Sequence, residues 1–322
     1  MPELAAQPEL DAQYRAMREG AGVLDRPGRG KLTISGAEAA EYLQGQLTNE
    51  IEGLAQNQGA YAALLDRKGH VQADMRVLRP TEASMGAIWL DLEPAATAPA
   101  LKHLRTYSIG RELQIEDVGG LWAITSLIGP AAAAISGFEG LAPEHAQRSR
   151  DWDGIEPVAV ATDLGIDLIT GAEQGPELRE RLRDQGAEEV SEEAAEILRI
   201  ESGRPRFGHE LGPATMPAEA GIVERAVDFE KGCYIGQEPV ARLHYRGKPN
   251  RRLCGLRLSG PAEPETPIRL GDREVGALGS ACISPALGPI ALAVVRREAE
   301  LGATLELAGG VTGELVGLPF SA

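Results

Sequence analysis

The loss of helical periodicity after about residue 250 restricts the fold of this chain more than any other feature. The C-terminal region consists of short apolar runs, among them LCGLRL, VGALGSACI, IALAVV and TLELAGGVTGELVGL. Gly-Asp, Pro-Ala-Leu-Gly and Gly-Gly segments divide these runs, and such turns between short strands are typical of small all-β barrels and sandwiches. We therefore predict a small C-terminal β-barrel domain over residues 246–322.

The part of the chain before this region mixes strand and helix signals. LWAITSLIG and GIDLIT are typical of strands, whereas PELRERLRDQG and SEEAAEILRIESG are typical of helices. Because strands and helices do not alternate strictly, the pattern favours an α+β fold. A length of 322 residues suits two or three compact units. We predict two α+β lobes over residues 1–245, which can interleave, with a break near residue 120.

A hairpin is predicted in the first lobe. Residues 66–69, Asp-Arg-Lys-Gly, have the composition of a tight turn between YAALL and HVQADMRVL. Apolar and polar residues alternate over residues 71–77, which is the pattern of a half-buried antiparallel strand. Asp74 is therefore expected on the polar face, where an ordinary surface pair with Arg76 is one possible role.

Two helices have recognisable ends. Ser35 and Glu38 have the spacing of a capping box, which predicts a short helix that starts near Ala37. Further along the chain, Ser191 is placed as the N-cap of a helix, and Gly203 stands beyond its last turn.

The net charge limits the classes of partner. The chain has 32 basic and 48 acidic residues, a formal net charge of -16 at pH 7, and a surface of that sign repels nucleic acid and anionic membranes. We therefore expect no general nucleic-acid binding. The N-terminal segment MPELAAQPEL lacks the basic and apolar regions of a signal peptide, and no apolar run has the length of a membrane span. These features predict a cytoplasmic protein without a membrane partner.

The chain contains three cysteines, Cys233, Cys254 and Cys282, and no pair of them has metal-ligand spacing. Neither a disulfide framework nor a metal site is therefore expected. Cys254 and Cys282 fall in predicted strands, where a buried apolar role is the ordinary one.

The segment KGCYIGQEPVARLHYRGKPNRR, residues 231–252, places a thiol beside a turn and a basic run. Gly232 and Gly236 allow backbone conformations closed to other residues, which predicts a sharp turn with an exposed Cys233 thiol. Lys231 is two residues away, and a nearby ammonium favours the thiolate. The alternative is that Cys233 packs as a small buried apolar residue.

No acidic residue occurs between Pro239 and Ala262, although the chain as a whole is acidic. This interval contains six basic residues: Arg242, Arg246, Lys248, Arg251, Arg252 and Arg257. A planar guanidinium binds a carboxylate or phosphate bidentately, so the interval predicts a local anion site. The alternative is a solvated basic face with internal salt bridges.

Aromatic residues make up only 4% of the chain, yet four of them lie close together in the sequence. These are Phe207, Phe229, Tyr234 and Tyr245. Such a cluster can line a slot for a flat heterocycle, although core packing explains Phe207 and Phe229 equally well. Glu201 and Glu219 lie upstream, and a carboxylate can accept paired hydrogen bonds from an amino-pyrimidine edge. A surface position at a helix end is the alternative for Glu201.

These segments resemble the YgfZ family of folate-binding proteins, which are relatives of the glycine cleavage T-protein. The resemblance rests on KGCYIGQE and on SGAEAAEYLQGQLTNEI, LLDRKGHVQADMRVL, RIESGRPRFGHEL, PAEAGI, VARLHYRG, GSACISP and IALAVVRR. It covers most of the chain apart from a weak region near 130–160. The family implies a three-lobed ring, with two mixed α/β lobes of antiparallel sheets and a β-barrel around a central hole that takes tetrahydrofolate or a derivative.

The resemblance also implies roles for individual residues. Carboxylates would hold the pterin, aromatic side chains would cover its faces, and arginines would bind the glutamate tail. The implied folate-binding residues are Glu201, Phe207, Glu219, Tyr234, Gln237, Glu238, Arg242 and Arg246. Cys233 would be the functional thiol, with Lys231 beside it.

Two departures from the T-protein pattern bear on function. Cys233 and Tyr234 stand where that pattern has an aspartate and a phenylalanine, and Ala73 replaces one of two aspartates, so that only Asp74 remains. YgfZ-like proteins are associated with the assembly or repair of iron–sulphur clusters in enzymes such as tRNA methylthiotransferases. The resemblance therefore implies a tetrahydrofolate-binding accessory protein whose partners are iron–sulphur client proteins.

Two other functions stay open at this stage. The first is an aminomethyltransferase, in which Asp74 orients or deprotonates the folate amine. The second is a degenerate folate binder or an oxidoreductase subunit, since one fold hosts many functions. Whether the protein turns over a reaction is not decided by the sequence.

Overall fold

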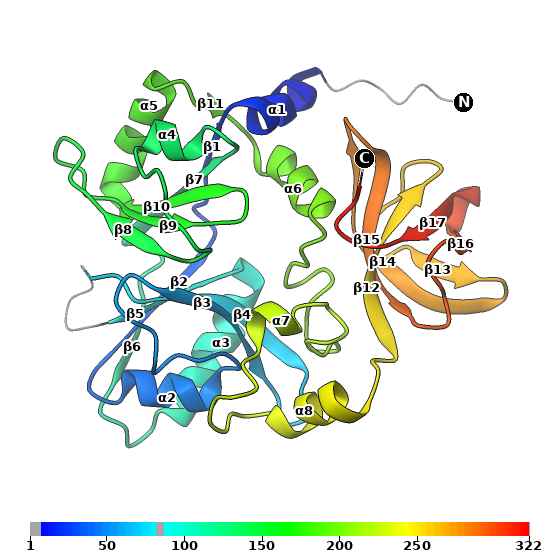
Figure 1. Ribbon diagram of the computed structural model, residues 1–322, viewed down its shortest axis with the longest axis horizontal. Helices are drawn as coiled ribbons and strands as arrows, with labels where there is room; N and C mark the ends of the chain where they lie inside the picture. The colour runs from blue at the N-terminus through cyan, green and yellow to red at the C-terminus, as the bar shows by residue number, and fades with distance from the viewer. Residues whose placement is uncertain (1–7, 82–86, 322) are drawn as a thin grey trace. The chain divides into compact units, whose positions relative to one another are not determined.

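The computed structural model describes residues 8–81 and 87–321 of the chain, and Figure 1 shows the arrangement of its helices and strands. The chain divides into two compact units, each built from two separate stretches of sequence. Unit 1 comprises Met1–Arg29 and Val118–Leu198, and unit 2 comprises Gly30–Asp117 and Arg199–Ala322. Each unit is described separately below.

Unit 1 is built around a six-stranded sheet with the order β11-β1-β7-β10-β9-β8. All its strand pairs are antiparallel except β1 and β11. Its strands are β1 (Gly22–Asp25), β7 (Trp122–Ile128), β8 (Gln147–Ser149), β9 (Val158–Ala161), β10 (Gly165–Gly171) and β11 (Glu188–Glu189). Its helices are α1 (Pro8–Glu19), α4 (Ala132–Ser136), the 3-10 helix η2 (Ala172–Gln174), α5 (Gly175–Asp184) and α6 (Glu192–Glu201), whose last residues belong to unit 2.

The elements predicted for unit 1 are confirmed. The two apolar runs form β7 and β10, which pair along their whole length and bury Leu127 and Leu168 in the core. The Ser191 hydroxyl accepts a hydrogen bond from the N–H of Ala194 at 3.2 Å, which satisfies one of the free donors at the start of α6. Beyond the helix, Gly203 has a positive φ of 74°, as a glycine that ends a helix commonly does.

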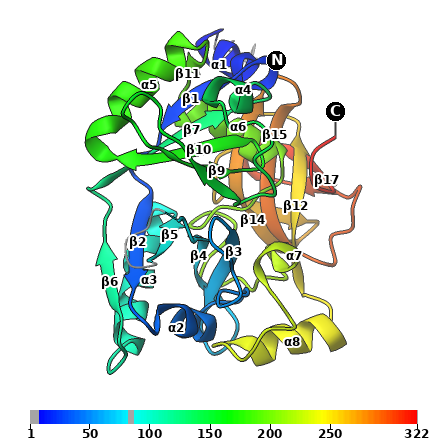
Figure 2. The ribbon, with the colours of Figure 1, turned by 60° about the vertical axis from the view of Figure 1, so that its left-hand side comes forward.

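Unit 2 contains a five-stranded antiparallel sheet with the order β3-β4-β5-β2-β6. Its strands are β2 (Gly30–Ser35), β3 (Gly59–Leu65), β4 (Val71–Leu78), β5 (Ile88–Leu92) and β6 (Gln114–Asp117), and its helices are α2 (Ala39–Gln46), α3 (Pro94–Tyr107), α7 (Val223–Ala226) and α8 (Gln237–Arg246). In Figures 1 and 2, α2 and α8 lie at the same end of this unit.

The hairpin prediction in unit 2 is confirmed, but the capping box is wrong. β3 and β4 pair in antiparallel register across the turn at residues 66–69. The first helix starts at Ala39 rather than near Ala37, and no side chain caps it. Glu38 instead binds the side chain of Arg111 at 3.1 Å, so a long-range ion pair takes the carboxylate that the sequence pattern assigned to the helix end.

The barrel is also part of unit 2, and it is closed. Its strands pair in the order β12-β15-β14-β13-β16-β17. They are β12 (Arg251–Leu258), β13 (Pro267–Leu270), β14 (Arg273–Ser284), β15 (Gly288–Arg296), β16 (Thr304–Glu306) and β17 (Thr312–Val316), with the 3-10 helix η3 (Ala308–Gly310) between the last two. An apolar core fills the barrel, as expected for a small barrel whose inward side chains meet. The predicted fold class, mixed lobes with antiparallel sheets and a C-terminal β-barrel, is confirmed.

Candidate functional site

The loop that carries the motif cysteine connects α7 to α8 in unit 2, and residues 227–236 are named the Cys233 loop here. Cys233 is exposed at its apex, together with Gly232. The other two thiols lie in the barrel, where Cys254 is buried and Cys282 is half-buried. The three cysteines therefore differ in their access to solvent, and Cys233 has the greatest.

Backbone hydrogen bonds fasten both sides of the Cys233 loop to the end of α2. On the first side, the N–H of Asp228 donates to the carbonyl of Thr48 at 3.0 Å. On the second side, the N–H of Ile235 donates to the carbonyl of Gly45 at 3.3 Å. The apex with the thiol is thus held between two attachment points.

Lys231 does not lie free beside the thiol. Its ammonium donates hydrogen bonds to the backbone carbonyls of Gln44, Leu47 and Asn49, at 2.7, 2.7 and 2.8 Å. An ammonium has three N–H donors, so none remains for the Cys233 sulphur. These hydrogen bonds attach the side chain of Lys231 to the backbone near the end of α2.

The end of the Cys233 loop packs against the hairpin turn at residues 66–69. Gly236 has a φ of 84°, and a Cβ there would overlap the carbonyl oxygen of Asp66 and lie 2.9 Å from the side chain of Leu65. Across the same contact, Gly69 has a φ of 81°, and a Cβ there would lie 3.2 Å from Pro239. The glycine prediction holds for Gly236, whereas Gly232 does not have a positive φ.

We expect Gly236→Ala to destabilise the protein by at least about 2 kcal/mol, because it combines backbone strain with a clash against main-chain atoms. The measurement is the thermal unfolding midpoint, for which about 2 kcal/mol corresponds to roughly 4 °C or more in a domain of this size. Gly232→Ala is the matched control, since a Cβ at that position meets no atom within 4 Å. Equal midpoints for the two variants would contradict the packing described.

Tyr234 borders a pocket at the start of α8. The pocket has a volume of about 440 Å³ and is lined by Arg67, Tyr107, Tyr234, Ile235, Gly236, Gln237, Glu238 and Pro239. The Tyr234 hydroxyl is buried and has no hydrogen-bond partner among the described residues, and burial raises the pKa of Tyr234 to about 12. The Tyr234 hydroxyl is therefore neutral and can donate or accept a hydrogen bond. Gln237 and Glu238, also predicted site residues, lie in the same lining.

A second pocket of about 440 Å³ adjoins the first along α8, because both linings include Glu238 and Pro239. Its lining comprises Lys68, Met216, Glu238, Pro239, Arg242, Leu243, Arg246 and Gly247. Three cations against one carboxylate give this lining a local positive charge on an acidic protein. The structure thus brings the predicted residues Arg242 and Arg246 together, one turn apart on the same helix.

The rest of the predicted basic interval does not join this pocket. Arg251 binds Glu219 through Nε at 3.0 Å and through Nη2 at 2.8 Å. Arg252 donates to the carbonyl of Ala299 at 2.9 Å, and Arg257 donates to the carbonyl of Ser321. The internal salt-bridge alternative therefore applies to Arg251, whose partner Glu219 lies between α6 and α7.

Three predicted pterin-binding residues lie away from the two pockets. Glu201 ends α6 and accepts a hydrogen bond from the Ser284 hydroxyl at 2.5 Å. The Glu219 carboxylate, besides its Arg251 partner, accepts the N–H of Met216 at 3.0 Å. Phe207 is buried in the apolar core of unit 2. None of the three lines either pocket on α8, and each has a structural role in unit 2.

Asp74 is buried rather than exposed on a polar face. It is 8% exposed, and its Oδ2 accepts a hydrogen bond from the Tyr61 hydroxyl at 2.7 Å. The alternative of an exposed surface pair with Arg76 does not apply to a carboxylate buried in this way, and Arg76 binds Asp91 at 2.6 Å. Burial first, and the Asp74 carboxylate next, raise the pKa of Tyr61 well above its usual value. The phenol therefore stays protonated and holds the carboxylate in place.

The sequence did not single out the neighbours of Asp74. The guanidinium of Arg225 lies 4.7 Å from the centre of the Tyr61 ring, and the Asn49 side chain donates to the backbone carbonyls of both residues, at 2.9 and 3.0 Å. The hairpin register places Ala63 opposite Asp74, so Tyr61 is its diagonal neighbour on the same face. The predicted turn at residues 66–69 was the signal that could have identified Tyr61.

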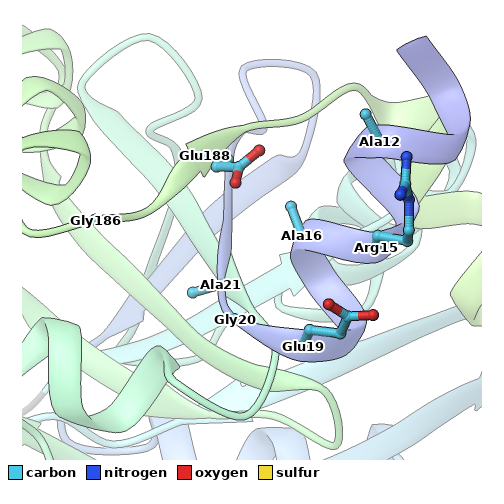
Figure 3. Close-up of a pocket in the computed structure, with 8 residues that line it drawn as sticks. All are labelled: Ala12, Arg15, Ala16, Glu19, Gly20, Ala21, Gly186 and Glu188. Carbon is cyan, nitrogen blue, oxygen red and sulfur yellow. The ribbon is translucent and has the colours of Figure 1, made fainter. Parts of the chain in front are cut away.

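A third pocket, in unit 1, contains no predicted site residue. It has a volume of about 420 Å³ and is lined by Ala12, Arg15, Ala16, Glu19, Gly20, Ala21, Gly186 and Glu188. Figure 3 shows its three charged side chains on α1 and β11, two carboxylates and one guanidinium. The three charged side chains are exposed, and the buried lining residue Ala21 is apolar, so the chemistry of this pocket points to no ligand class.

Within residues 8–81 and 87–321, no three or more His, Cys, Asp or Glu side chains gather where a metal ion could be held. Across the same ranges, no helix has both the length and the apolar character required to cross a membrane.

The exposure of the three thiols predicts their order of alkylation. Cys233 should react first, Cys282 second, and Cys254 last, because burial raises the pKa of the Cys254 thiol and blocks access to it. We expect Cys254 to react at least about 100-fold more slowly than Cys233 in the native protein. Timed iodoacetamide labelling with peptide mass spectrometry measures all three in one sample. If Cys254 labelled as fast as Cys233, the described burial would be wrong.

Comparison with known protein families gives two matches, which together cover both ends of the chain. The GCVT N-terminal domain matches residues 3–142. The glycine cleavage T-protein C-terminal barrel domain matches residues 251–320, the region of the closed barrel.

Relatives match over nearly the whole chain. An aminomethyltransferase of Saccharopolyspora erythraea is 30% identical and aligns with 96% of this chain and 89% of its own length. One from Rubrobacter xylanophilus is 28% identical, with 97% and 86% covered. The putative transferase At1g60990, chloroplastic, of Arabidopsis thaliana is 27% identical, with 97% and 74% covered.

Among solved structures, the glycine cleavage system aminomethyltransferase T from Bartonella henselae has the same fold. Its TM-score is 0.85 at 21% sequence identity, and the match covers 97% of this chain and 89% of that one. This likeness concerns the fold alone.

Proposed function

Because this chain belongs to the glycine cleavage T-protein family of aminomethyltransferases, we propose that it binds a tetrahydrofolate and serves as an accessory protein for iron–sulphur enzymes. In this proposal it acts in the cytoplasm on the assembly or repair of its clients, tRNA-modifying enzymes among them, as its YgfZ-like signature suggests. The observation that carries the proposal is the exposed Cys233 at the apex of a loop fastened on both sides.

Folate binding is supported by the chemistry of the two pockets on α8. A folate combines a flat heterocycle with an anionic glutamate tail, so it needs an aromatic contact and a group of cations. Tyr234 is an aromatic residue in the pocket lining, and its buried hydroxyl has no partner in the described part of the chain. Arg242 and Arg246, with Lys68, offer the cations for the tail. These residues fit such a ligand, and they are the ones assigned to it here.

Two further residues are assigned to the pterin on the resemblance. The carboxylate of Glu201 accepts the hydroxyl of Ser284, and the carboxylate of Glu219 accepts three N–H groups, from Nε and Nη2 of Arg251 and from the backbone of Met216. A carboxylate has about four acceptor positions, so Glu219 could accept one further N–H group from a pterin, and Glu201 is assigned as the second acceptor. Phe207 would support this contact from the core.

The chemistry of the thiol limits what it can do to a cluster. An iron–sulphur cluster takes about four protein ligands, and one exposed thiolate supplies a single ligand. Cys233 is therefore proposed to act on a cluster that the client protein holds, by transient thiolate ligation at one iron. The client supplies the remaining ligands throughout.

A second candidate function, aminomethyl transfer to a folate, is favoured by the pair of Asp74 and Tyr61. A buried carboxylate held at 2.7 Å by a phenol that remains protonated is a suitable group to orient or deprotonate an amine. The test is ammonia release from aminomethyl-lipoyl carrier protein in the presence of tetrahydrofolate. Turnover at about one per second or faster, as in an ordinary enzyme, would favour this function over the first.

The experiment that tests the first proposal is a deletion strain assayed for iron–sulphur enzyme activities and for glycine cleavage. We expect the deletion to lower the iron–sulphur activities, leave glycine cleavage unchanged, and be reversed by the wild-type gene. Calorimetric titration of the purified protein should show saturable tetrahydrofolate binding. Loss of glycine cleavage alone, or no folate binding at about millimolar ligand, would contradict the proposal.

A further inference from the structure

Lys231 is a buried charge of unit 2 whose three donors are all paired, and the function proposed above does not use it. Its residue exposure is 8%, and its three hydrogen bonds all go to backbone carbonyls near the end of α2. Burying an ammonium is costly unless every donor is paired. The arrangement at Lys231 meets that condition, so the side chain occupies one defined position.

The position of the ammonium follows from the end of α2. The last carbonyls of a helix lack intrahelical partners and carry the negative end of the helix dipole. The Cys233 loop supplies the missing donors, because the Lys231 ammonium binds the carbonyl of Gln44 and the N–H of Ile235 binds that of Gly45. The Cys233 loop therefore supplies hydrogen-bond donors to carbonyls at the end of α2.

The charge state of Lys231 supports this contact. Burial lowers the pKa of Lys231 to about 8, and the carboxylates of Glu50 and Asp228 act in the opposite direction. The side chain is thus mainly an ammonium at pH 7 and keeps all three donors. Its Nζ also lies 5.2 Å from the centre of the Tyr234 ring, a distance at which a cation is attracted to an aromatic face.

We propose that Lys231 is a positioning residue, which clamps the Cys233 loop to the end of α2 and thereby fixes where the thiol projects. This inference rests on the proposed function of Cys233 as the working thiol. Lys231 contacts neither client nor folate in this proposal; it acts only through the loop.

Other contacts hold the entrance of the loop, which makes the effect of Lys231 separable. The hydroxyl of Thr48 donates to the carbonyl of Ala226 at 2.5 Å, and the Asn49 side chain donates to that of Arg225 at 3.0 Å. These bonds lie before the apex and do not involve the ammonium. Removing the Lys231 donors should therefore loosen the middle of the loop and leave α7 in place.

The structural test compares hydrogen exchange in the wild type and in Lys231→Met, which keeps the length of the side chain without its donors. Loss of three charge-assisted hydrogen bonds should speed exchange in peptides covering residues 227–236 by about tenfold or more. Barrel peptides report global unfolding and should not change. Lys102→Met is the matched control, because Lys102 is exposed on α3 of the same unit.

If the Met variant does not fold, Lys231→Gln serves instead, since it keeps two N–H donors and should give a smaller rise in loop exchange. Unchanged exchange in residues 227–236, in whichever of these variants folds, would overturn the clamp. A rise confined to this loop would support it.

The functional test uses the deletion strain and separates positioning from a general loss of structure. Lys231→Met should lower iron–sulphur enzyme activity by about tenfold, while Cys233 can still be alkylated and tetrahydrofolate still binds. Lys231→Arg, which keeps the charge, should recover part of the activity and of the loop protection. Full activity in a variant with a loosened loop would overturn the positioning role. Failure of the wild-type gene to complement would instead contradict the proposed function, and the exchange result would then decide on the clamp alone.

Discussion

Cys233→Ala is expected to reduce iron–sulphur enzyme activities in the complemented deletion strain to the level of the deletion itself. The reason is that the proposed action consists of one thiolate ligand, and alanine supplies none. The residue is exposed at a loop apex, so the substitution should change the free energy of unfolding by no more than about 0.5 kcal/mol. Tetrahydrofolate binding, measured by calorimetry, should be unchanged.

Cys282→Ala is the matched control for this substitution, because it removes a thiol from strand β14 of the barrel rather than from the loop. It should complement as well as the wild type. Cys233→Ser adds a second comparison, since a hydroxyl keeps the size of the side chain but is a poor ligand for iron. Full complementation by Cys233→Ala would exclude the thiol from the function, and the loop would then serve only to shape the pockets on α8.

The second large effect is expected for the double substitution of Arg242 and Arg246 with alanine, which should weaken tetrahydrofolate binding by about 100-fold at low salt. Each arginine is expected to contribute about one charge-assisted hydrogen bond to the glutamate tail, worth about 1.5 kcal/mol or more. Both line the same pocket on α8, so each substitution should weaken binding of the same ligand. Calorimetric titration measures the effect.

The salt dependence of binding checks the physical cause. Wild-type binding should weaken as salt rises, because exposed charges are screened beyond about 10 Å at 0.1 M ionic strength, and the double variant should lose most of this dependence. Arg273→Ala is the control, since Arg273 is an exposed arginine of the barrel that pairs with Glu298 at 3.2 Å. Equal affinities for the wild type and the double variant would place the tail elsewhere.

The elements that could be predicted from the sequence are those set by neighbouring residues. The β3–β4 hairpin and the barrel strands were predicted because turn residues and alternation act over a few positions. The capping box failed for a complementary reason. Glu38 binds Arg111, which is distant in the sequence but close in unit 2. A local sequence pattern does not predict such a contact.

The face of Asp74 was mispredicted because alternation assigns a residue to a face but does not say what covers that face. In β4 both faces are covered, so the polar side of the strand became a buried site with Tyr61. Arg76, the expected partner, is on the same face but binds Asp91 of the adjacent strand β5. Sheet neighbours beyond the hairpin were not available from the sequence.

The location of Lys231 was beyond prediction for the same reason. The motif singled out the residue, but its three acceptors are backbone carbonyls, which carry no sequence signature, and the first of them lies 187 positions earlier in the chain. Arg242 and Arg246 were easier, since residues four apart on a helix share a face. The sequence did not predict that α8 ends at Arg246 and that β12 begins at Arg251, so it did not predict which arginines share the helix.

The close contact between the 66–69 turn and α8 fixes the length of that turn. Surface turns commonly accept inserted residues, but here a Cβ at Gly236 would overlap the carbonyl oxygen of Asp66, and a Cβ at Gly69 would lie 3.2 Å from the side chain of Pro239. We expect an added residue in this turn to displace α8 from the hairpin and to disrupt both pockets that α8 lines. The turn at Gly271 has no neighbour within 4 Å of an added Cβ, so it is the better place to attach a peptide tag or a fluorophore.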